Sequence, residues 1–327
     1  MIQILELFGG IGSPRVALRN LGIPVKAIDY VEIDEKAVRS YNAMFKDELE
    51  YKTQSVVGWN LKPDILIHGS PCQDFSIAGH QKGADEGTET RSSLMRETIN
   101  IIQQMGAWKP RYVIWENVKN VLSKHMIHNF NRYLSEIQKL GYTNSFECLD
   151  AREFGLPQRR NRVFTISCLS GECFNFNELI RTKMNDIKDY LLNEDEVDER
   201  YKIVSPSMLS RIETTDSKTF SGINRIITDF AECITTKQDR CPNSGVIPYK
   251  GGYRLLTELE CWRLQGYCDN DYYNALEANP GIDGKKNTAL YKQAGNSIPV
   301  PIFESIFRKI LLGEIRQVEF EQMKLGV

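Results

Sequence analysis

Short apolar runs alternate with amphipathic stretches through the first half of this 327-residue chain, and this alternation restricts the possible folds more than any other feature. The runs with the character of strands are residues 2–7, 25–32, 65–68, 112–115, 143–149 and 163–168. The stretches with helical spacing are residues 15–21, 35–45, 94–105 and 128–140. Alternating strands and helices predict an α/β sheet with helices on both of its faces.

The second half of the chain lacks this regular alternation. Residues 185–199 are polar and end in five acids within six positions, which favours a solvated linker or helix face. Residues 200–250 carry many Ser and Thr without helical spacing, so short strands and loops are expected there. Helical spacing returns at residues 254–266 and 298–312. We therefore predict a large α/β domain at 1–172, a small irregular β-rich domain at 173–284 with a boundary segment at 252–284, and a C-terminal return to the first domain at 285–327.

The composition is that of an ordinary globular protein, 41% hydrophobic and 26% charged. No apolar run approaches the ~18–20 residues that a membrane span needs. The strand-like start after Met1 has no basic region before it, so we expect no signal peptide, no membrane partner and a cytoplasmic location. The eight cysteines include no C-x-x-C pair and only four histidines occur, so no metal site is expected. A net charge of −2 argues against a uniformly basic protein that coats nucleic acid, but a local basic cleft stays compatible with it.

Cys72 follows the apolar run 65–67 and a Gly-Ser-Pro turn. This pattern predicts a thiol presented by a loop at the end of a buried strand, where a nucleophile is both rigid and accessible. The alternative is a small buried hydrophobic side chain, which is what most free cysteines are. The local pattern leaves both interpretations open.

Three further strand ends carry chemical groups: the glycine loop at residues 8–12, Glu32 and Glu116. Because ligands of open α/β sheets bind outside the carboxyl ends of the strands, these groups and Cys72 are predicted to line one cleft. Glu32 lies twenty residues after Gly12, at the spacing of a carboxylate that binds ribose hydroxyls. Arg15 stands where the dinucleotide fingerprint has its third glycine, so an adenosine ligand is predicted rather than a pyrophosphate.

Three other groups have competing interpretations. Glu116 is a candidate acid with a raised pKa, or an acid that satisfies backbone donors at a helix start. The arginines of segment 158–162 recognise phosphates or bases, or form a solvated basic turn; alternation sends Arg160 and Arg162 to the same side. Asn296 caps the apolar helix that follows it, or reaches the amino-acid part of a cofactor.

Taken together, these segments resemble the DNA (cytosine-5)-methyltransferases of bacterial and phage restriction-modification systems. The resemblance covers residues 1–168 and 252–312, and the motifs occur in the order of that family. They are the S-adenosylmethionine loop at 8–12, the nucleophile motif at 69–76, the acid motif at 116–118, the arginine motif at 158–162, the segment that organises recognition at 254–266 and the last motif at 293–297. The stretch at about 173–251 takes the place of the target-recognition region.

The resemblance implies a Rossmann-like S-adenosylmethionine-dependent methyltransferase domain with a small irregular β-rich target-recognition domain. It further implies that the Cys72 thiolate adds to C6 of a flipped cytosine, that Glu116 binds N3, and that Arg162 holds the base oxygen with support from Arg160. The catalytic residues it implies are Cys72, Glu116, Arg160 and Arg162. Cofactor contacts are expected from Phe8, Gly9, Gly10, Ile11, Gly12, Glu32, Ile33, Gln54, Pro71, Asn296 and Ser297. Contacts to DNA are expected from Gln73, Ser76, Arg91, Gln158, Thr235 and Thr236.

One position departs from the family pattern. Where the family has an acid that accepts from the adenine amino group, this chain has Gln54 in a loosely matching stretch. S-adenosylmethionine, with S-adenosylhomocysteine as its product, is nevertheless the expected cofactor. Double-stranded DNA is the expected partner of a monomer, with a separate cognate restriction endonuclease left open. The alternatives are a tRNA methyltransferase with the same chemistry, a non-catalytic nucleic-acid-binding relative and, less compatible with the motifs, an NAD-dependent oxidoreductase.

Overall fold

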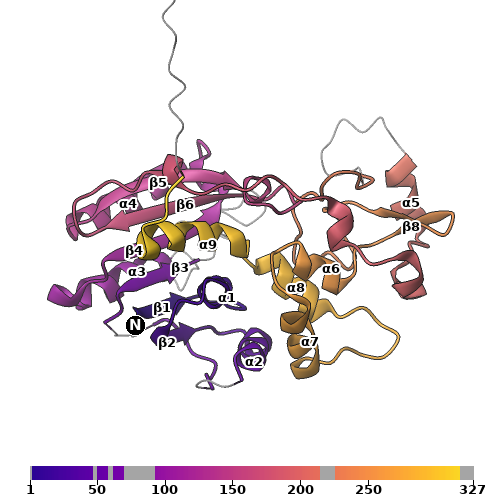
Figure 1. The fold of residues 1–327 in the computed structure, drawn as a ribbon, viewed down its shortest axis with the longest axis horizontal. Coiled ribbons are helices and arrows are strands. Elements are labelled where there is room, and N and C mark those ends of the chain that lie inside the picture. Colours follow the sequence, from indigo (N-terminus) through magenta and orange to yellow (C-terminus); the bar gives the residue numbers. More distant parts are fainter. Residues whose placement is uncertain (1, 47–49, 58–61, 70–92, 214–224, 317–327) are drawn as a thin grey trace, which may run out of the picture.

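The computed structural model describes residues 2–46, 50–57, 62–69, 93–213 and 225–316. A six-stranded sheet with the order β2-β1-β3-β4-β6-β5 forms its centre (Figure 1). The strands are β1 (Ile2–Leu7), β2 (Val25–Val31), β3 (Ile65–His68), β4 (Tyr112–Val118), β5 (Thr143–Asp150) and β6 (Asn161–Cys168). The strands β1 to β4 run parallel, whereas β6 is antiparallel to both of its neighbours. All six predicted strands are confirmed.

Three strands are longer than predicted, and two of them, β4 and β6, gain residues of the candidate site. β4 continues three residues past its predicted end, so Glu116 lies within the strand rather than after it. β6 starts two residues early, at Asn161, so Arg162 is also a strand residue. In the β4–β6 register Arg162 lies opposite Val118, two positions from Glu116. Long side chains reach such diagonal neighbours, so the added pairing brings the acid and the arginine together.

Helices cover both faces of the sheet, as predicted. One face carries α1 (Ser13–Asn20), α2 (Glu35–Met44) and α9 (Val300–Phe307), and the other carries α3 (Ser93–Gln104) and α4 (Ile127–Lys139). The central strand β3 shows why both layers are needed: Ile65 and Ile67 pack into the first core and Leu66 into the second. A parallel strand that is buried on both faces has a continuous run of apolar residues, and residues 65–67 form such a run in β3.

The helix α9 comes from the end of the chain and packs against α1 near its start. It continues into a π-helical turn, Arg308–Leu312, and Gly313 ends it in the left-handed conformation. The predicted helix at 298–312 is therefore present, with its first residue at Val300. Within the described ranges, no helix is both long and apolar enough to cross a membrane.

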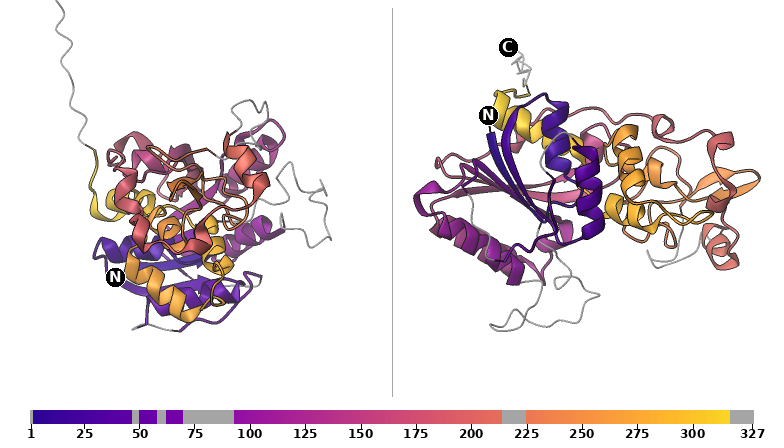
Figure 2. Two further views of the ribbon diagram at one scale, coloured as in Figure 1. Left: turned by 90° about the vertical axis from the view of Figure 1, so that its right-hand side faces the viewer. Right: turned by 90° about the horizontal axis from the view of Figure 1, so that it is seen from below.

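Residues 173–182 still pack against the sheet and α9, since Arg181 pairs with Glu147 of β5 and Ser305 donates to the carbonyl of Ile180. The described residues between 190 and 284 have shorter elements and extend away from the sheet (Figure 2). Their described part holds a two-stranded hairpin of β7 (Ile247–Tyr249) and β8 (Gly252–Arg254), as expected for a region of short strands. It also holds the helices α5 (Pro206–Glu213), α6 (Glu258–Arg263) and α7 (Asp269–Ala278). The prediction of strands and loops alone for residues 200–250 is wrong at α5, where Pro206 supplies a φ suited to a first helical turn.

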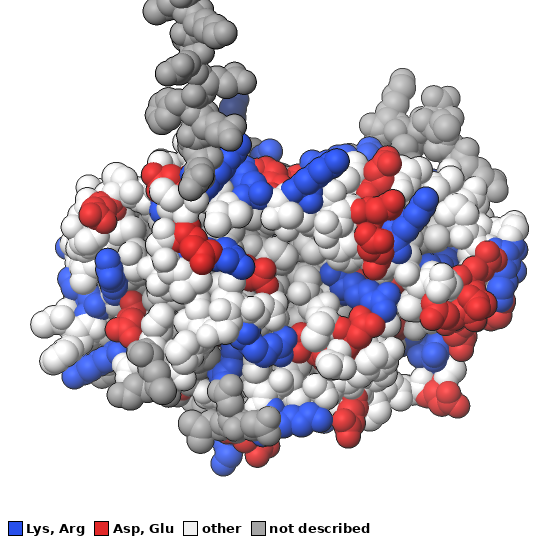
Figure 3. Space-filling model, viewed as in Figure 1, with Lys and Arg blue, Asp and Glu red and all other residues white. Residues whose placement is uncertain are grey.

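The acidic stretch 194–199 is solvated on one side but is not a free linker. Lys250 binds it twice, since its backbone N–H donates to Glu194 and its ammonium lies 2.7 Å from Glu199. Val197 is buried beneath. The side of the molecule seen in Figure 3 carries interspersed positive and negative side chains rather than a continuous basic surface, in keeping with the net charge of −2.

Candidate active site

The glycine loop connects β1 to α1 at the carboxyl edge of the sheet. Gly12 has a φ of 75° and precedes the first residue of α1. A Cβ at Gly12 would lie 2.5 Å from the ring of Tyr41, so glycine is required for both conformation and space. Gly10 also has a positive φ, but a Cβ there would meet no atom within 4 Å. The loop therefore faces open space at Gly10 and packed side chains at Gly12.

Glu32 follows β2 and binds the glycine loop. Its Oε2 accepts from the N–H of Gly10 at 2.9 Å, and its Oε1 accepts from the N–H groups of Ile33 and Asp34, both at 2.8 Å. The backbone N–H of Gln54 donates to the carbonyl of Glu32 at 2.8 Å. One edge of the sheet thus brings together several predicted cofactor residues: the glycine loop, Glu32, Ile33 and Gln54.

The chemistry of this edge fits an adenosine cofactor. The Glu32 carboxylate offers acceptors for ribose hydroxyls, the adjoining Ile33 is 74% exposed and offers an apolar surface, and Gly10 leaves room for a ligand beside them. Among the residues that the structure describes, no cluster of His, Cys, Asp and Glu could hold a metal ion.

Glu6 is a buried acid that sequence reasoning missed. It is 1% exposed, both of its oxygens lack a hydrogen-bond partner, and Oε2 would lie 3.4 Å from a Cβ on Gly9. Burial raises the pKa of Glu6 to about 8, although Arg15 partly opposes the shift. The signal in the sequence is an acid inside an apolar strand, directly before the glycine loop.

The raised pKa of Glu6 predicts how stability changes with pH. Because the folded value, about 8, exceeds the ordinary 4.5, the protonated acid stabilises the fold at low pH, and this contribution is lost as pH rises from 4.5 to about 8. At the alkaline end of that window, we expect the free energy of unfolding of Glu6→Gln to exceed that of the wild type by on the order of 2–4 kcal/mol. Chemical unfolding across this pH range measures the difference, and parallel curves for the two proteins would contradict it.

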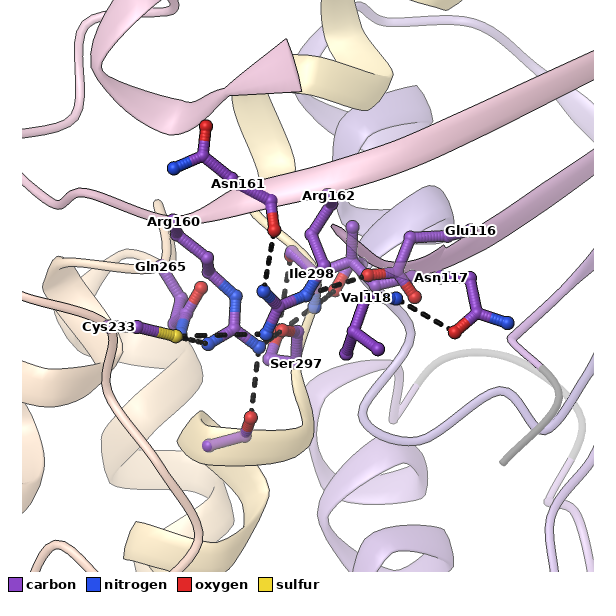
Figure 4. Close-up of polar contacts among 12 residues, drawn as sticks. Glu116, Asn117, Val118, Arg160, Asn161, Arg162, Cys233, Gln265, Ser297 and Ile298 are labelled. Atoms are coloured by element: carbon purple, nitrogen blue, oxygen red, sulfur yellow. Dashed lines mark hydrogen bonds and ion pairs between the residues drawn. The ribbon is translucent and has the colours of Figure 1, made fainter. Parts of the chain in front are cut away.

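Glu116 and Arg162 form an ion pair between β4 and β6 (Figure 4). Nε of Arg162 lies 3.0 Å from Oε1 of Glu116, and the two side chains are only 14% and 13% exposed. Burial raises the pKa of Glu116, while the positive charges of Arg162 and Arg160 partly oppose the shift. A carboxyl in this environment can hold a proton at a higher pH than an exposed one and donate it to a ligand.

The chain that leads to Cys72 passes directly beside Glu116. β3 ends at His68, and a Cβ on the next residue, Gly69, would lie 3.7 Å from Oε2 of Glu116. The predicted site residues Pro71, Cys72, Gln73, Ser76 and Arg91 themselves lie outside the described residues. The described chain therefore stops three residues short of the thiol, with its last residue against the acid.

Arg160 is placed differently from the prediction of a catalytic residue. It is 2% exposed, and its guanidinium donates to the backbone carbonyls of Ile234 (2.8 Å), Gly295 (2.9 Å) and Ser297 (2.6 Å). Burial lowers the pKa of Arg160 to about 10, and the neighbouring Arg162 adds to this. Arg160 joins three segments of the backbone, so it is a positioning residue rather than one that touches a substrate.

Arg160→Lys is expected to lower the free energy of unfolding by roughly 3–5 kcal/mol, because an ammonium cannot reach three carbonyls at once and leaves buried acceptors unsatisfied. Thermal unfolding measures the loss, and amide hydrogen exchange should show faster exchange at Ile234. Arg308→Lys, at an exposed ion pair with Glu314, is the matched control. Unchanged exchange at Ile234 would show that Arg160 does not hold this segment.

Gln158 is also a positioning residue, and its predicted role as a DNA contact is wrong. It is completely buried, its Nε2 donates to the carbonyl of Leu264, and its Oε1 accepts from the N–H of Ile234.

Thr235 and Thr236 directly follow Ile234, and their backbone lies 2.4 Å from the Cβ position of Gly295. Only glycine allows this approach, which sets residues 231–236 directly against the end of α8 (Thr288–Asn296).

The two last predicted cofactor residues, Asn296 and Ser297, differ in exposure. Asn296 is exposed at the end of α8, whereas the Ser297 hydroxyl is buried and bonds to Ser13 at 3.0 Å and to Tyr267 at 2.8 Å. The alternative that Asn296 caps the next helix is wrong, because Pro299 occupies the N-cap position of α9. Asn296 thus stays available to a ligand, and Ser297 connects α1 to the end of α8.

Cys233 is the second residue that sequence reasoning missed. Its sulfur lies 3.3 Å from Nη1 of Arg160 and 3.7 Å from Nη2 of Arg162 (Figure 4). No motif marks it, because both arginines lie more than 70 positions away in the sequence. The described site thus consists of a cofactor edge at β1 and β2 and an acid–arginine–sulfur cluster at β4 and β6.

Comparisons with known proteins agree with this arrangement. The family model of the C-5 cytosine-specific DNA methylase matches residues 2–312. Type II methyltransferase M2.ScrFI of Lactococcus lactis subsp. cremoris is 32% identical, over 95% of this chain and 99% of that protein. Orphan methyltransferase M.SPRI of Bacillus phage SPR is 24% identical, over 95% and 97% of the two chains.

Solved structures show the same fold. The S. pombe Dnmt2 methyltransferase superposes with a TM-score of 0.73 at 19% identity, over 96% of this chain and 99% of that one. A putative DNA modification methyltransferase encoded within an E. coli prophage superposes with a TM-score of 0.67 at 17% identity, over 96% and 100%. The family match spans nearly the whole chain and includes the glycine loop, Glu116 and both arginines, so this protein belongs to the C-5 cytosine-specific DNA methylases.

Proposed function

We propose that this protein transfers a methyl group from S-adenosylmethionine to C5 of a specific cytosine in double-stranded DNA, with Cys72, Glu116 and Arg162 acting on the base. The observation that carries the proposal is the buried Glu116–Arg162 pair, against which the chain leading to Cys72 is packed at Gly69. Glu116 and the cofactor edge lie at the carboxyl ends of parallel strands of one sheet, where α/β enzymes bind their ligands, and Arg162 lies beside Glu116 at the start of the antiparallel β6.

The first step is addition of Cys72 to the base. C5 of cytosine is a weak nucleophile, but attack of the Cys72 thiolate at C6 moves the ring electrons toward C5 and N3. The target carbon is inaccessible within the stacked duplex, so the cytosine must be flipped into the site. The activated C5 then takes the methyl group. Loss of H5 to a base, for which water is a candidate, finally expels the thiolate and restores the aromatic ring.

Glu116 binds N3 of the flipped cytosine and donates its proton there. Its burial favours the protonated acid, so it can neutralise the negative charge that the thiolate attack delivers to N3. Arg162 aligns the carboxyl through the 3.0 Å contact and holds the base oxygen with its remaining donors. Arg160 supports this arrangement from behind, through the backbone of residues 234, 295 and 297.

The cofactor binds where the glycine loop meets Glu32, and when bound it supplies the electrophilic methyl group. Glu32 receives the ribose hydroxyls, Ile33 packs against the adenine, and Asn296 reaches the amino-acid part. The backbone of Gln54 is held beside Glu32, which supports a role for its side chain at the adenine, where the family has an acid. No metal is required by this chemistry.

The proposal extends to the cellular setting. Type II and orphan methyltransferases of bacteria and phages among the relatives support an enzyme that acts on bacterial or phage DNA in the cytoplasm. We further propose that it is a monomer and that any cognate endonuclease is a separate protein. Thr235 and Thr236, in the segment held against α8, are proposed to contact the DNA.

Transfer of labelled methyl groups to duplex DNA and to tRNA, compared side by side, tests the proposal. We expect label in the DNA alone, at C5 of cytosines in one sequence context that bisulfite mapping then identifies. Label in tRNA would favour an RNA methyltransferase, and label in neither would favour a binding protein without catalysis.

A further inference from the structure

Cys233 lies between two arginines of the site, within hydrogen-bond reach of both. The donors are Nη1 of Arg160 at 3.3 Å and Nη2 of Arg162 at 3.7 Å, and both guanidiniums point at the sulfur (Figure 4). Hydrogen bonds to sulfur are longer than those to oxygen, and an ionised sulfur accepts them more strongly than a neutral thiol. Cys233 itself is partly buried and directly precedes Ile234, whose carbonyl Arg160 binds.

Arg160 gives this contact its importance. Arg160 is 2% exposed, so its charge is buried. Among the described residues, its hydrogen-bond acceptors are three neutral carbonyls and the Cys233 sulfur. A buried charge that has no opposite charge beside it strongly disfavours the folded site. Glu116 pairs with Arg162, so it is not the direct partner of Arg160. The sulfur is the acceptor of Arg160 that can itself become negative.

We propose that Cys233 is a positioning residue of the methyl-transfer site, with its thiolate serving as counter-ion of Arg160 and holding Arg162 in line with Glu116. The effect of this alignment on methyl transfer rests on the proposed function, whereas the ionisation of Cys233 is independent of it. When Glu116 takes up a proton, Arg162 loses the negative charge of its partner. A thiolate 3.7 Å from Nη2 then keeps the guanidinium in place.

The charges around the sulfur favour its ionised form. Burial by itself raises the pKa of the Cys233 thiol, but the charges and hydrogen bonds of Arg160 and Arg162 outweigh burial and lower the pKa. The segment at residues 295–297 presents backbone carbonyls to Arg160, and Glu116 on β4 acts on the cluster through Arg162. On ionisation the thiol proton passes to solvent and the negative charge stays on sulfur.

Alkylation by iodoacetamide tests the ionisation directly. The protein carries Cys72→Ala, the reaction runs over a pH series, and mass spectrometry quantifies the peptide of each cysteine. We expect the rate at Cys233 to reach half its maximum below the ordinary thiol value of about 8.5. The exposed Cys241 in the same digest is the reference. A midpoint at or above that of Cys241 would overturn the proposal, and because no turnover is needed, the result is independent of the proposed function.

Two variants at Cys233 then test its effect on methyl transfer. Cys233→Ser keeps a neutral acceptor that does not ionise, and we expect kcat to fall about 10–100-fold, as for a displaced catalytic group. The KM for S-adenosylmethionine should stay unchanged, because the glycine loop is not touched. Cys233→Asp restores a negative charge and should recover most of kcat. A serine variant with wild-type kcat at every pH would show that a neutral acceptor suffices.

Discussion

Cys72→Ser abolishes methyl transfer to duplex DNA, while S-adenosylmethionine still binds. A serine hydroxyl at neutral pH is not ionised, so it cannot add to C6 as a thiolate does. The expected loss is on the order of 10⁴-fold or more, since removing a covalent nucleophile costs up to roughly 10⁶ in other enzymes. The expected cofactor contacts come from the glycine loop and Glu32 rather than from the side chain of Cys72, so the affinity for the cofactor should not change.

Two measurements separate these effects: the rate of label transfer to DNA and calorimetric binding of the cofactor. A duplex with 5-fluorocytosine adds a third, because fluorine cannot leave as a proton and the wild-type protein should stay covalently attached. Cys241→Ser, at an exposed thiol, is the matched control and should retain full activity. Substantial turnover by Cys72→Ser, or a covalent complex formed without Cys72, would refute the mechanism.

Glu116→Gln lowers kcat by about 10²–10⁴-fold, the usual contribution of a general acid. The amide keeps the size of the side chain but cannot deliver a proton to N3, and it leaves the buried Arg162 without a carboxylate. Cofactor affinity should again be unaffected. Glu136→Gln, at a surface pair on α4, provides the control.

The pH dependence of kcat offers a separate check on Glu116. Burial raises its pKa above 4.5, so the acid form persists to higher pH than in an exposed glutamate. Since the reaction uses the acid form, kcat should decline as pH rises through this raised pKa. The glutamine variant should lack that decline. If kcat declines identically at alkaline pH in both proteins, another group causes the decline.

Local patterns predicted the sheet and the groups at its edge, because strand periodicity and glycine spacing are properties of neighbouring residues. Glu32 and the glycine loop meet as expected, through the contact of Gly10 with the carboxylate. Glu116 and Arg162 also meet, although their strands turned out longer than the apolar runs alone suggest. Residues 70–92, which include the thiol, lie outside the described structure, so the role of Cys72 stays a prediction.

Contacts between distant segments could not be predicted in this way. Arg160 was predicted as a catalytic residue and Gln158 as a DNA contact, yet both bind backbone groups 74 to 137 positions away. Cys233 had no recognisable signal, because its chemistry depends on arginines from another part of the chain. Glu6 was detectable in principle, as an acid in an apolar strand, but its lack of partners is visible only after folding.

Three of the contacts that hold the segment at residues 231–236 in place are made with its main chain. Arg160 binds a carbonyl, Gln158 binds an amide, and Gly295 touches the peptide between Thr235 and Thr236. Contacts to the main chain do not depend on which side chains the segment carries. Apart from Cys233 and the buried Ala231 and Ile234, the side chains of this stretch can therefore change by mutation while the catalytic framework stays intact, and such freedom at Thr235 and Thr236 would let new sequence specificities evolve on an unchanged chemical centre.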